Sequence, residues 1–192
     1  RSTTLDEPNT HRYMTNLRTL AIGVLLTGAL TMASTGWAAS REEMKKGTEL
    51  TIKEFKKQDP SITKFFDSSA GYAVIPTVGK GAFGVGGAHG KGLLYEKGKV
   101  TGDVSMSQVT IGFQLGGQTY SEVIFFENTT TLESFKTSKF AMSAQASAVA
   151  AAAGASQNAK YEQGVAVFTI AKGGLMYEAS VGGQKFKYKP TK

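Results

Sequence analysis

Cysteine is absent from the chain, and this absence excludes disulfide bonds, thiolate metal ligands, cysteine nucleophiles and a lipid-modified N-terminal cysteine. Histidine is nearly absent, since only His11 and His89 occur. We interpret His89 as an exposed loop residue, because it lies among glycines with no aspartate nearby in the sequence. A Ser-His-Asp arrangement built from distant segments stays open. The sequence therefore predicts no metal site, no cofactor and no catalytic residues.

Proline is also scarce, with 4 residues, whereas glycine is abundant, with 23. Frequent glycine without proline indicates tight turns and close backbone contacts in a β-rich fold. The apolar fraction of 41% and the charged fraction of 19% are typical of a globular protein. The formal net charge of +7 favours anionic partners, although a merely soluble basic domain is equally compatible with it.

A long hydrophobic run is missing as well. The apolar segment LAIGVLLTGAL spans only the eleven residues 20–30, whereas a transmembrane helix needs roughly 20. It follows Arg18 and precedes small residues, which is typical of a signal peptide. We therefore predict a leader and signal peptide over residues 1–38, cleaved after Ala38, and a single domain over residues 39–192; a short uncleaved anchor is the alternative. The domain would be periplasmic or secreted, and peripherally associated with the cell envelope. The origin of residues 1–13 stays open.

Hydrophobic periodicity predicts a helical start to this domain. Ser40 and Glu43 form a capping box, and the apolar spacing that follows predicts an amphipathic helix that ends at Asp59-Pro60. A second, short helix is expected to be capped by Ser61, and another is expected over residues 129–136.

Alternating apolar residues predict strands along most of the remaining chain. Strands are expected over residues 72–76, 83–87, 104–115, 120–126, 165–170, 175–181 and 186–188, and on both sides of a turn at Lys97-Gly98. Residues 140–155 fit either a helix or a strand. The predicted fold class is α+β, with a curved, mostly antiparallel β-sheet or partial barrel of roughly eight strands and N-terminal helices packed on it.

The glycine-rich stretch over residues 78–92, VGKGAFGVGGAHGKG, contains the pattern G-x-G-x-x-G at 79–84. In a dinucleotide-binding fold this pattern precedes a helix. Here further glycines follow, each of which would cost about 1 kcal/mol in a helix. The Walker A pattern also fails, because Gly92 stands where serine or threonine is required. We interpret the glycines as residues that let strands bend and pack closely.

Several segments resemble the SYLF domain in the same order and with similar gaps. They are IPTVGKGAFGVGGAHGKGLL (75–94), VTIGFQLGGQTYSEVIFFENTTTLESF (109–135), FAMSAQASAVAAAAG (140–154) and VAVFTIAKGGLMYEASVGGQKF (165–186). The resemblance covers about residues 42–188. It implies a lipid-binding module, tied in eukaryotic relatives to phosphoinositides and actin. Ala88 replaces an arginine frequent in the family, and the family's Gly-Pro-x-Gly-Arg segment is missing near Ala150, which argues against a defined phosphoinositide pocket.

The first helix of the domain is the candidate lipid-binding element. Its apolar stripe, with Met44, Ile52 and Phe55, would insert into a lipid surface while neighbouring lysines contact phosphate groups. Alternatively, the same stripe packs on the sheet and the lysines face water. The resemblance favours the first interpretation. The predicted lipid-binding residues are Lys45, Lys46, Ile52, Lys53, Phe55, Lys56 and Lys57.

Three classes of function stay open at this point. The favoured one is a non-enzymatic module that binds anionic phospholipid head groups, with no nucleic acid partner. The alternatives are a small outer-membrane β-barrel or structural envelope protein, and an enzyme, for which no constellation of residues is found. Glu122 and Glu127 flank an apolar run and are interpreted as edge or rim residues. Actin is not an expected partner, because a secreted bacterial chain would not meet it routinely. The oligomeric state stays open.

Overall fold

The computed structural model describes residues 40–83, 85–111, 118–138, 140–143, 146–172 and 179–191. The compact unit that carries the fold spans Met44–Lys192. Within it, the described strands are joined in one sheet with the order β7-β5-β6-β4-β1-β2-β3-β8. The strands are β1 (Gly71–Phe83), β2 (Val85–Glu96), β3 (Lys99–Ile111), β4 (Gln118–Phe126), β5 (Ser147–Ala150), β6 (Val165–Lys172), β7 (Ala179–Ser180) and β8 (Lys185–Pro190).

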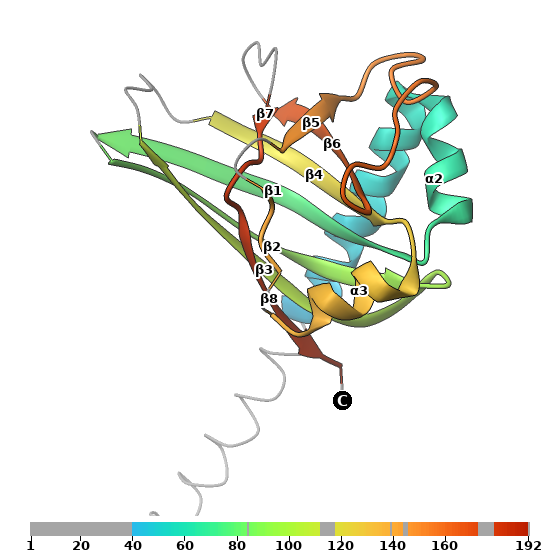
Figure 1. The fold of residues 1–192 in the computed structure, drawn as a ribbon, viewed down its shortest axis with the longest axis horizontal. Helices are drawn as coiled ribbons and strands as arrows, with labels where there is room; N and C mark the ends of the chain where they lie inside the picture. Colours follow the sequence, from blue (N-terminus) through green and yellow to red (C-terminus); the bar gives the residue numbers. More distant parts are fainter. Residues whose placement is uncertain are drawn as a thin grey trace, which may run out of the picture. The chain divides into compact units, whose positions relative to one another are not determined.

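The sheet is curved, open and almost entirely antiparallel (Figure 1). Only β5 and β6 run parallel, and their register joins just Val149 to Phe168 and Ala150 to Thr169. β7 and β8 are the two edges of the strand order. The predicted α+β class, with a curved and mostly antiparallel sheet of about eight strands, is confirmed.

The helices begin and end where local side chains provide caps. The N-terminal helix covers residues 40–58 and ends before Asp59-Pro60, as predicted. The turn η2 (Pro60–Ile62) leads directly into α2 (Thr63–Ser68). The N-cap of η2 is Asp59 and not Ser61, because the Asp59 carboxylate accepts a hydrogen bond from the Ser61 amide. The helix α3 (Thr129–Lys136) is capped by Asn128, whose side chain accepts the Thr131 amide.

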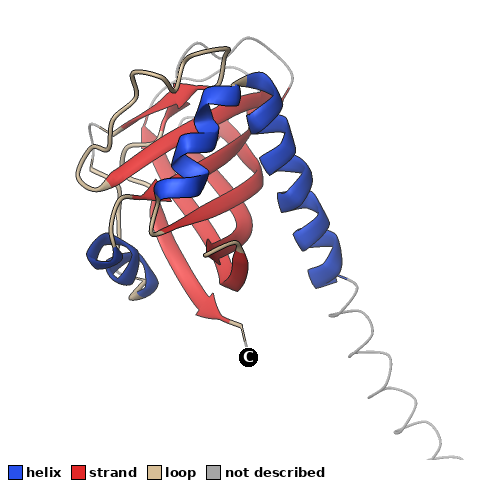
Figure 2. Cartoon of the chain, turned by 90° about the vertical axis from the view of Figure 1, so that its right-hand side faces the viewer, coloured by secondary structure: helices blue, strands red, loops and turns tan. Residues whose placement is uncertain are grey.

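The sheet buries a hydrophobic cluster on each of its two faces. Residues of β4 divide between them, since Val123 and Phe125 belong to one cluster and Ile124 and Phe126 to the other. The cluster with Phe125 lies beneath the N-terminal helix and α2, which cross the strands in Figure 2. The other cluster includes Phe135 of α3. This arrangement confirms that the helices pack on the sheet and that 120–126 is a fully buried strand.

Glycines are required where strands and neighbouring residues approach closely. A Cβ at Gly90 would lie 2.7 Å from the Ile75 side chain, and a Cβ at Gly92 would lie 2.8 Å from the Val74 backbone carbon. The G-x-G-x-x-G pattern falls in the hairpin of β1 and β2, with Gly84 outside the described residues, so a strand follows it and not a helix. The glycines thus shape the sheet, as the sequence indicated.

Four predicted segments differ from the structure. The strand expected over 83–87 is not continuous, since β1 ends at Phe83 and β2 begins at Val85. β1 extends well beyond the expected 72–76, because its glycine-rich continuation pairs with β2 despite the register shift between Val74 and Thr77. Residues 140–155 form neither a helix nor one strand; an isolated bridge at Ala141, the short β5 and turns occupy them where the structure describes them. The strand expected over 175–181 is seen only as β7, since 173–178 lie outside the described residues.

Candidate functional site

The N-terminal helix presents one face to the sheet. Thr48, Thr51 and Phe55 are buried on this face. The Thr48 hydroxyl lies 2.5 Å from the Tyr95 hydroxyl, a buried hydrogen bond that ties the helix to β2. Gly47 lies against β1, since a Cβ at this position would be 3.6 Å from the Pro76 ring. The helix is therefore an integral part of the domain.

The opposite face of this helix carries an exposed cationic stripe with one leucine. The cationic stripe consists of Lys46, Leu50, Lys53 and Lys57, which are all exposed. Their spacing of three or four residues places them on one side of the helix. Leu50 is 56% exposed, and among the large apolar residues that the structure describes only Val109 is exposed as well. An apolar side chain between lysines is what an interfacial helix requires, although Glu49 and Glu54 flank the stripe.

The structure separates the predicted lipid-binding residues into two groups. Lys45, Lys46, Lys53 and Lys57 are exposed, whereas Ile52 and Lys56 are partly buried. The Lys56 ammonium lies 4.8 Å from the centre of the Phe66 ring. Phe55 is fully buried in the cluster beneath the helix, which corrects its assignment to a lipid-contacting stripe. Leu50 was missed, although its spacing from the lysines on either side could have indicated it.

A second group of lysines lies on the edge strand β8. Lys185, Lys187 and Lys189 are exposed and alternate with Phe186 and Tyr188, which are buried and partly buried. The register Lys187–Ser105–Lys91 extends the same sheet face across β3 to β2. Lysines on an edge strand also prevent edge-to-edge association of sheets. This group is therefore a natural comparison for the cationic stripe.

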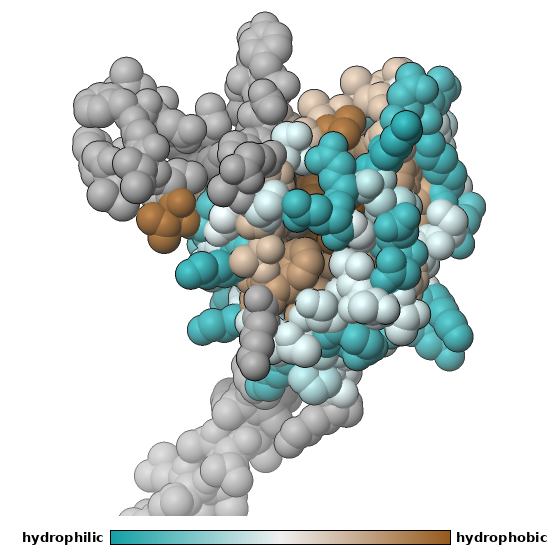
Figure 3. All heavy atoms as spheres, viewed as in Figure 1, coloured by the Kyte–Doolittle hydropathy of each residue, from teal (hydrophilic) through white to brown (hydrophobic). Residues whose placement is uncertain are grey.

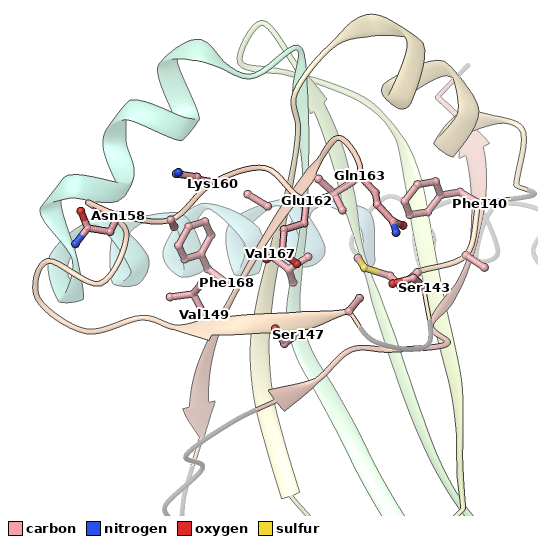
Figure 4. Close-up of a pocket in the computed structure, with 16 residues that line it drawn as sticks. Phe140, Ser143, Ser147, Val149, Asn158, Lys160, Glu162, Gln163, Val167 and Phe168 are labelled. Atoms are coloured by element: carbon pink, nitrogen blue, oxygen red, sulfur yellow. The ribbon is translucent and has the colours of Figure 1, made fainter.

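A cleft lies elsewhere, beside β5 and β6. Its volume is about 430 Å³. Apolar side chains such as Met142, Val165 and Val167 line it, together with Ser143, Ser147 and polar residues of the segment 158–163. In Figure 4 the lining residues follow one another from Asn158 and Lys160 at one end to Phe140 at the other. The cleft is thus an elongated trough with a mixed lining, which we call the β5–β6 trough.

Asp59 fixes the loop that leads into this trough. Its carboxylate accepts hydrogen bonds from the amides of Gly154 (3.2 Å) and Ser156 (2.7 Å) and from the Ser61 hydroxyl (2.5 Å). Burial alone would raise the pKa of Asp59, but the hydrogen bonds from Ser61, Ser156 and Gly154 outweigh it and hold this pKa below its ordinary value. Asp59 therefore stays ionised and couples the end of the N-terminal helix to residues 154–156.

Glu122 is buried, which corrects its interpretation as a rim residue. It lies on β4 with Tyr120, and the Gln184 side-chain amide donates to the Glu122 carboxylate (2.9 Å) and to the Tyr120 hydroxyl (3.3 Å). Burial and the nearby Glu122 charge raise the pKa of Tyr120. The alternation that places Tyr120, Glu122 and Ile124 on one face could have indicated this burial. Glu127, by contrast, is exposed as expected.

His89 is exposed, as expected, but it lies on β2 and not in a loop. Among the described residues, no group of three or more histidine, aspartate or glutamate side chains could hold a metal ion. Within the same residues, no helix combines the length and the apolar character needed to span a membrane.

Comparison with known proteins gives two matches. A family model, Ysc84, described as a Las17-binding protein actin regulator, matches residues 107–190. The protein named Beta cell expansion factor A, from Aeromonas veronii, is 30% identical over 137 residues, which make up 70% of this chain and 51% of that protein. The chain therefore spans about half the length of this curated relative.

Proposed function

We propose that the protein binds anionic phospholipid membranes reversibly through the cationic stripe, because residues 107–190 match the model of the Ysc84 family, also called SYLF, and this family binds lipid. The protein acts without catalysis, at the surface of the cell envelope, after removal of the leader near Ala38. The family is not a known enzyme family, and the resemblance stated from the sequence is confirmed by the family match.

The observation that carries this proposal is the exposure of Leu50 between Lys46, Lys53 and Lys57. Each lysine near an anionic bilayer contributes about 1 kcal/mol, so three contribute about 3 kcal/mol, or roughly a hundredfold in partitioning. Insertion of one leucine side chain contributes about 1.5–3 kcal/mol more. Because the inward face of the helix stays on the sheet, binding needs no unfolding of the helix.

Liposome flotation tests the proposal directly. The purified chain should float with vesicles that contain phosphatidylglycerol or cardiolipin, should float less at high salt, and should remain unbound with neutral phosphatidylcholine vesicles. The triple variant Lys46→Glu, Lys53→Glu, Lys57→Glu should lose flotation. Leu50→Ala should weaken it several-fold while the salt dependence is kept.

A charge-matched control uses the three exposed lysines of β8. Lys185→Glu, Lys187→Glu and Lys189→Glu change the net charge by the same amount on β8 and should leave most of the flotation intact. If this control variant lost flotation and the triple variant of the cationic stripe kept it, the membrane-contacting surface would be β8 and not the cationic stripe. Absence of flotation for the unmodified chain in low salt would refute the lipid proposal itself.

A further inference from the structure

The β5–β6 trough lies where pairing in the sheet is incomplete. β5 pairs with β6 only at Val149 and Ala150, so Val165–Val167 lie beyond the residues that β5 pairs with. The preceding segment 140–143 bridges to β8 instead, through Ala141 and Lys185. Among the described residues of the segment 140–148, none is paired with β6, and the cleft of about 430 Å³ lies beside this part of β6.

The floor of the trough is formed by core residues. Met142, Val165 and Val167 belong to the hydrophobic cluster on one face of the sheet, and Phe168 belongs to the cluster on the other face. A ligand that entered the trough would contact the core directly, without any opening of the sheet. In Figure 3, which views the molecule from the same side as Figure 1, hydrophobic residues are visible in the middle of the described surface with hydrophilic residues around them.

The two ends of the trough differ in charge. Asn158 and Lys160 lie at one end in Figure 4, and both are exposed. Phe140 lies at the other end, where Figure 4 also shows the uncharged side chains of Ser143 and Gln163. Glu162 lies on the rim as well, and it is exposed. An elongated apolar floor that ends in a lysine and an amide matches a molecule with one hydrocarbon chain and an anionic head.

We propose that the β5–β6 trough binds a single-chain anionic amphiphile, with its acyl chain on the apolar floor and its head group beside Lys160 and Asn158. Burial of the methylene groups of the acyl chain favours binding, and the head group of the ligand stays at the solvent-exposed end. The volume lies within the range of about 300–1,000 Å³ that is typical of small-ligand sites. This site goes beyond the proposed membrane contact, because it involves none of the residues of the cationic stripe.

Asp59 supports the trough from behind. It holds Gly154 and Ser156, and the chain then continues directly into Asn158–Gln163, the polar rim. A floor of core residues and a rim held by buried hydrogen bonds make the trough preformed, which lowers the entropic cost of binding.

Titration calorimetry with two probes below their critical micelle concentrations tests the site. Dodecanoate provides a carboxylate head and lysophosphatidylglycerol with a twelve-carbon chain provides a phosphate head. Saturable binding of one molecule per chain is expected for at least one probe, and the stronger probe identifies the source of the head group. Lys160→Glu should weaken binding about tenfold, whereas Glu162→Lys should preserve or strengthen it.

Two variants that fill the trough test its location. Ser147→Trp and Ala159→Phe each add a large side chain to the lining from a different wall, and each should lower the affinity at least tenfold. Val109→Trp is the matched control, because Val109 is 75% exposed and does not line the trough. Thermal melting of each variant establishes that it is folded.

The outcomes separate this inference from the membrane proposal. The triple glutamate variant of the cationic stripe should bind the probes as the unmodified chain does, and the filled variants should still float with anionic vesicles. No saturable binding of either probe would overturn the inference, and so would unchanged affinity in both folded trough-filling variants. Failure of flotation alone would overturn only the membrane contact.

Discussion

Replacing Asp59 by asparagine removes a buried negative charge that four donors approach. The donors are the Ser61 amide and hydroxyl and the amides of Gly154 and Ser156, at distances from 2.5 to 3.2 Å. The asparagine side chain of this variant has the same size but only one acceptor oxygen, and its NH₂ group faces amide donors that no longer have a partner. The substitution therefore tests the hydrogen bonds with little change in packing.

The structure allows the size of the effect to be worked out. A hydrogen bond to a charged group contributes about 1.5–3 kcal/mol, and a buried donor left without a partner costs about 1–3 kcal/mol. Because the asparagine keeps one acceptor, we expect the loss to equal one or two such bonds, or about 3 kcal/mol in the free energy of unfolding. For a domain of roughly 150 residues this lowers the melting temperature by about 6–12 °C.

The pH dependence provides a second readout with a defined sign. Hydrogen bonds hold the pKa of folded Asp59 below its ordinary value of 3.8. The unfolded chain therefore takes up this proton first as the pH falls, and the stabilisation, complete above the unfolded pKa, is lost as the pH falls through the folded pKa. The melting temperatures of the unmodified chain and of Asp59→Asn should differ most near neutral pH and become equal in strong acid.

Two results would refute this reasoning. One is a loss of less than about 1 kcal/mol at neutral pH for Asp59→Asn, since that is the value of an ordinary surface substitution. The other is a constant difference between the two melting curves at all pH values, since the contribution would then be independent of the ionised carboxylate. Ser134→Ala, at an exposed position on α3, is a suitable control with an expected change below about 0.5 kcal/mol.

Three further substitutions test the packing of the domain by urea denaturation. Thr48→Val should lower the free energy of unfolding by about 1–2 kcal/mol, because the buried Tyr95 hydroxyl loses its partner; an unchanged midpoint would contradict this. Gly92→Ala should cost more than about 2 kcal/mol through its clash with the neighbouring strand, whereas Gly79→Ala, with open space around it, should cost under about 1 kcal/mol; equal costs would refute the close-approach argument. Lys136→Ala removes a partly exposed ion-pair network and should lower the free energy of unfolding by less than about 1 kcal/mol. This loss should shrink at high salt, and unfolding curves at two ionic strengths that show the same loss would contradict it.

Elements set by local sequence were predictable. The end of the N-terminal helix at Asp59-Pro60, the turn at Lys97-Gly98 and α3 depend on neighbouring residues, and the structure contains each of them. Positive φ angles at Lys97 and Gly98 are the backbone reason for that turn. By contrast, residues 140–155 have conflicting local preferences, and the pairing of their described parts with three separate strands, β6, β7 and β8, decided their structure.

The candidate sites were less predictable, because periodicity identifies a stripe but not what covers it. Phe55 satisfies the pattern of a lipid-contacting residue and of a core residue equally well, and only the position of the sheet distinguishes the two. Leu50 then emerges as the apolar residue that the sheet leaves uncovered. The β5–β6 trough had no sequence signal, since it depends on where β5 stops pairing with β6.

The strand order has a consequence for shortened versions of the chain. Strands β1 to β4 are neighbours in the sequence and form the centre of the sheet, whereas the last part of the chain supplies β6 beside β4 and β8 beside β3. A fragment that stopped after α3 would therefore leave both flanks of the four-strand centre with unsatisfied backbone groups at the same time. Such a fragment should self-associate through either flank. The C-terminal third of the chain therefore protects the four central strands from aggregation by pairing with both outer strands of that group.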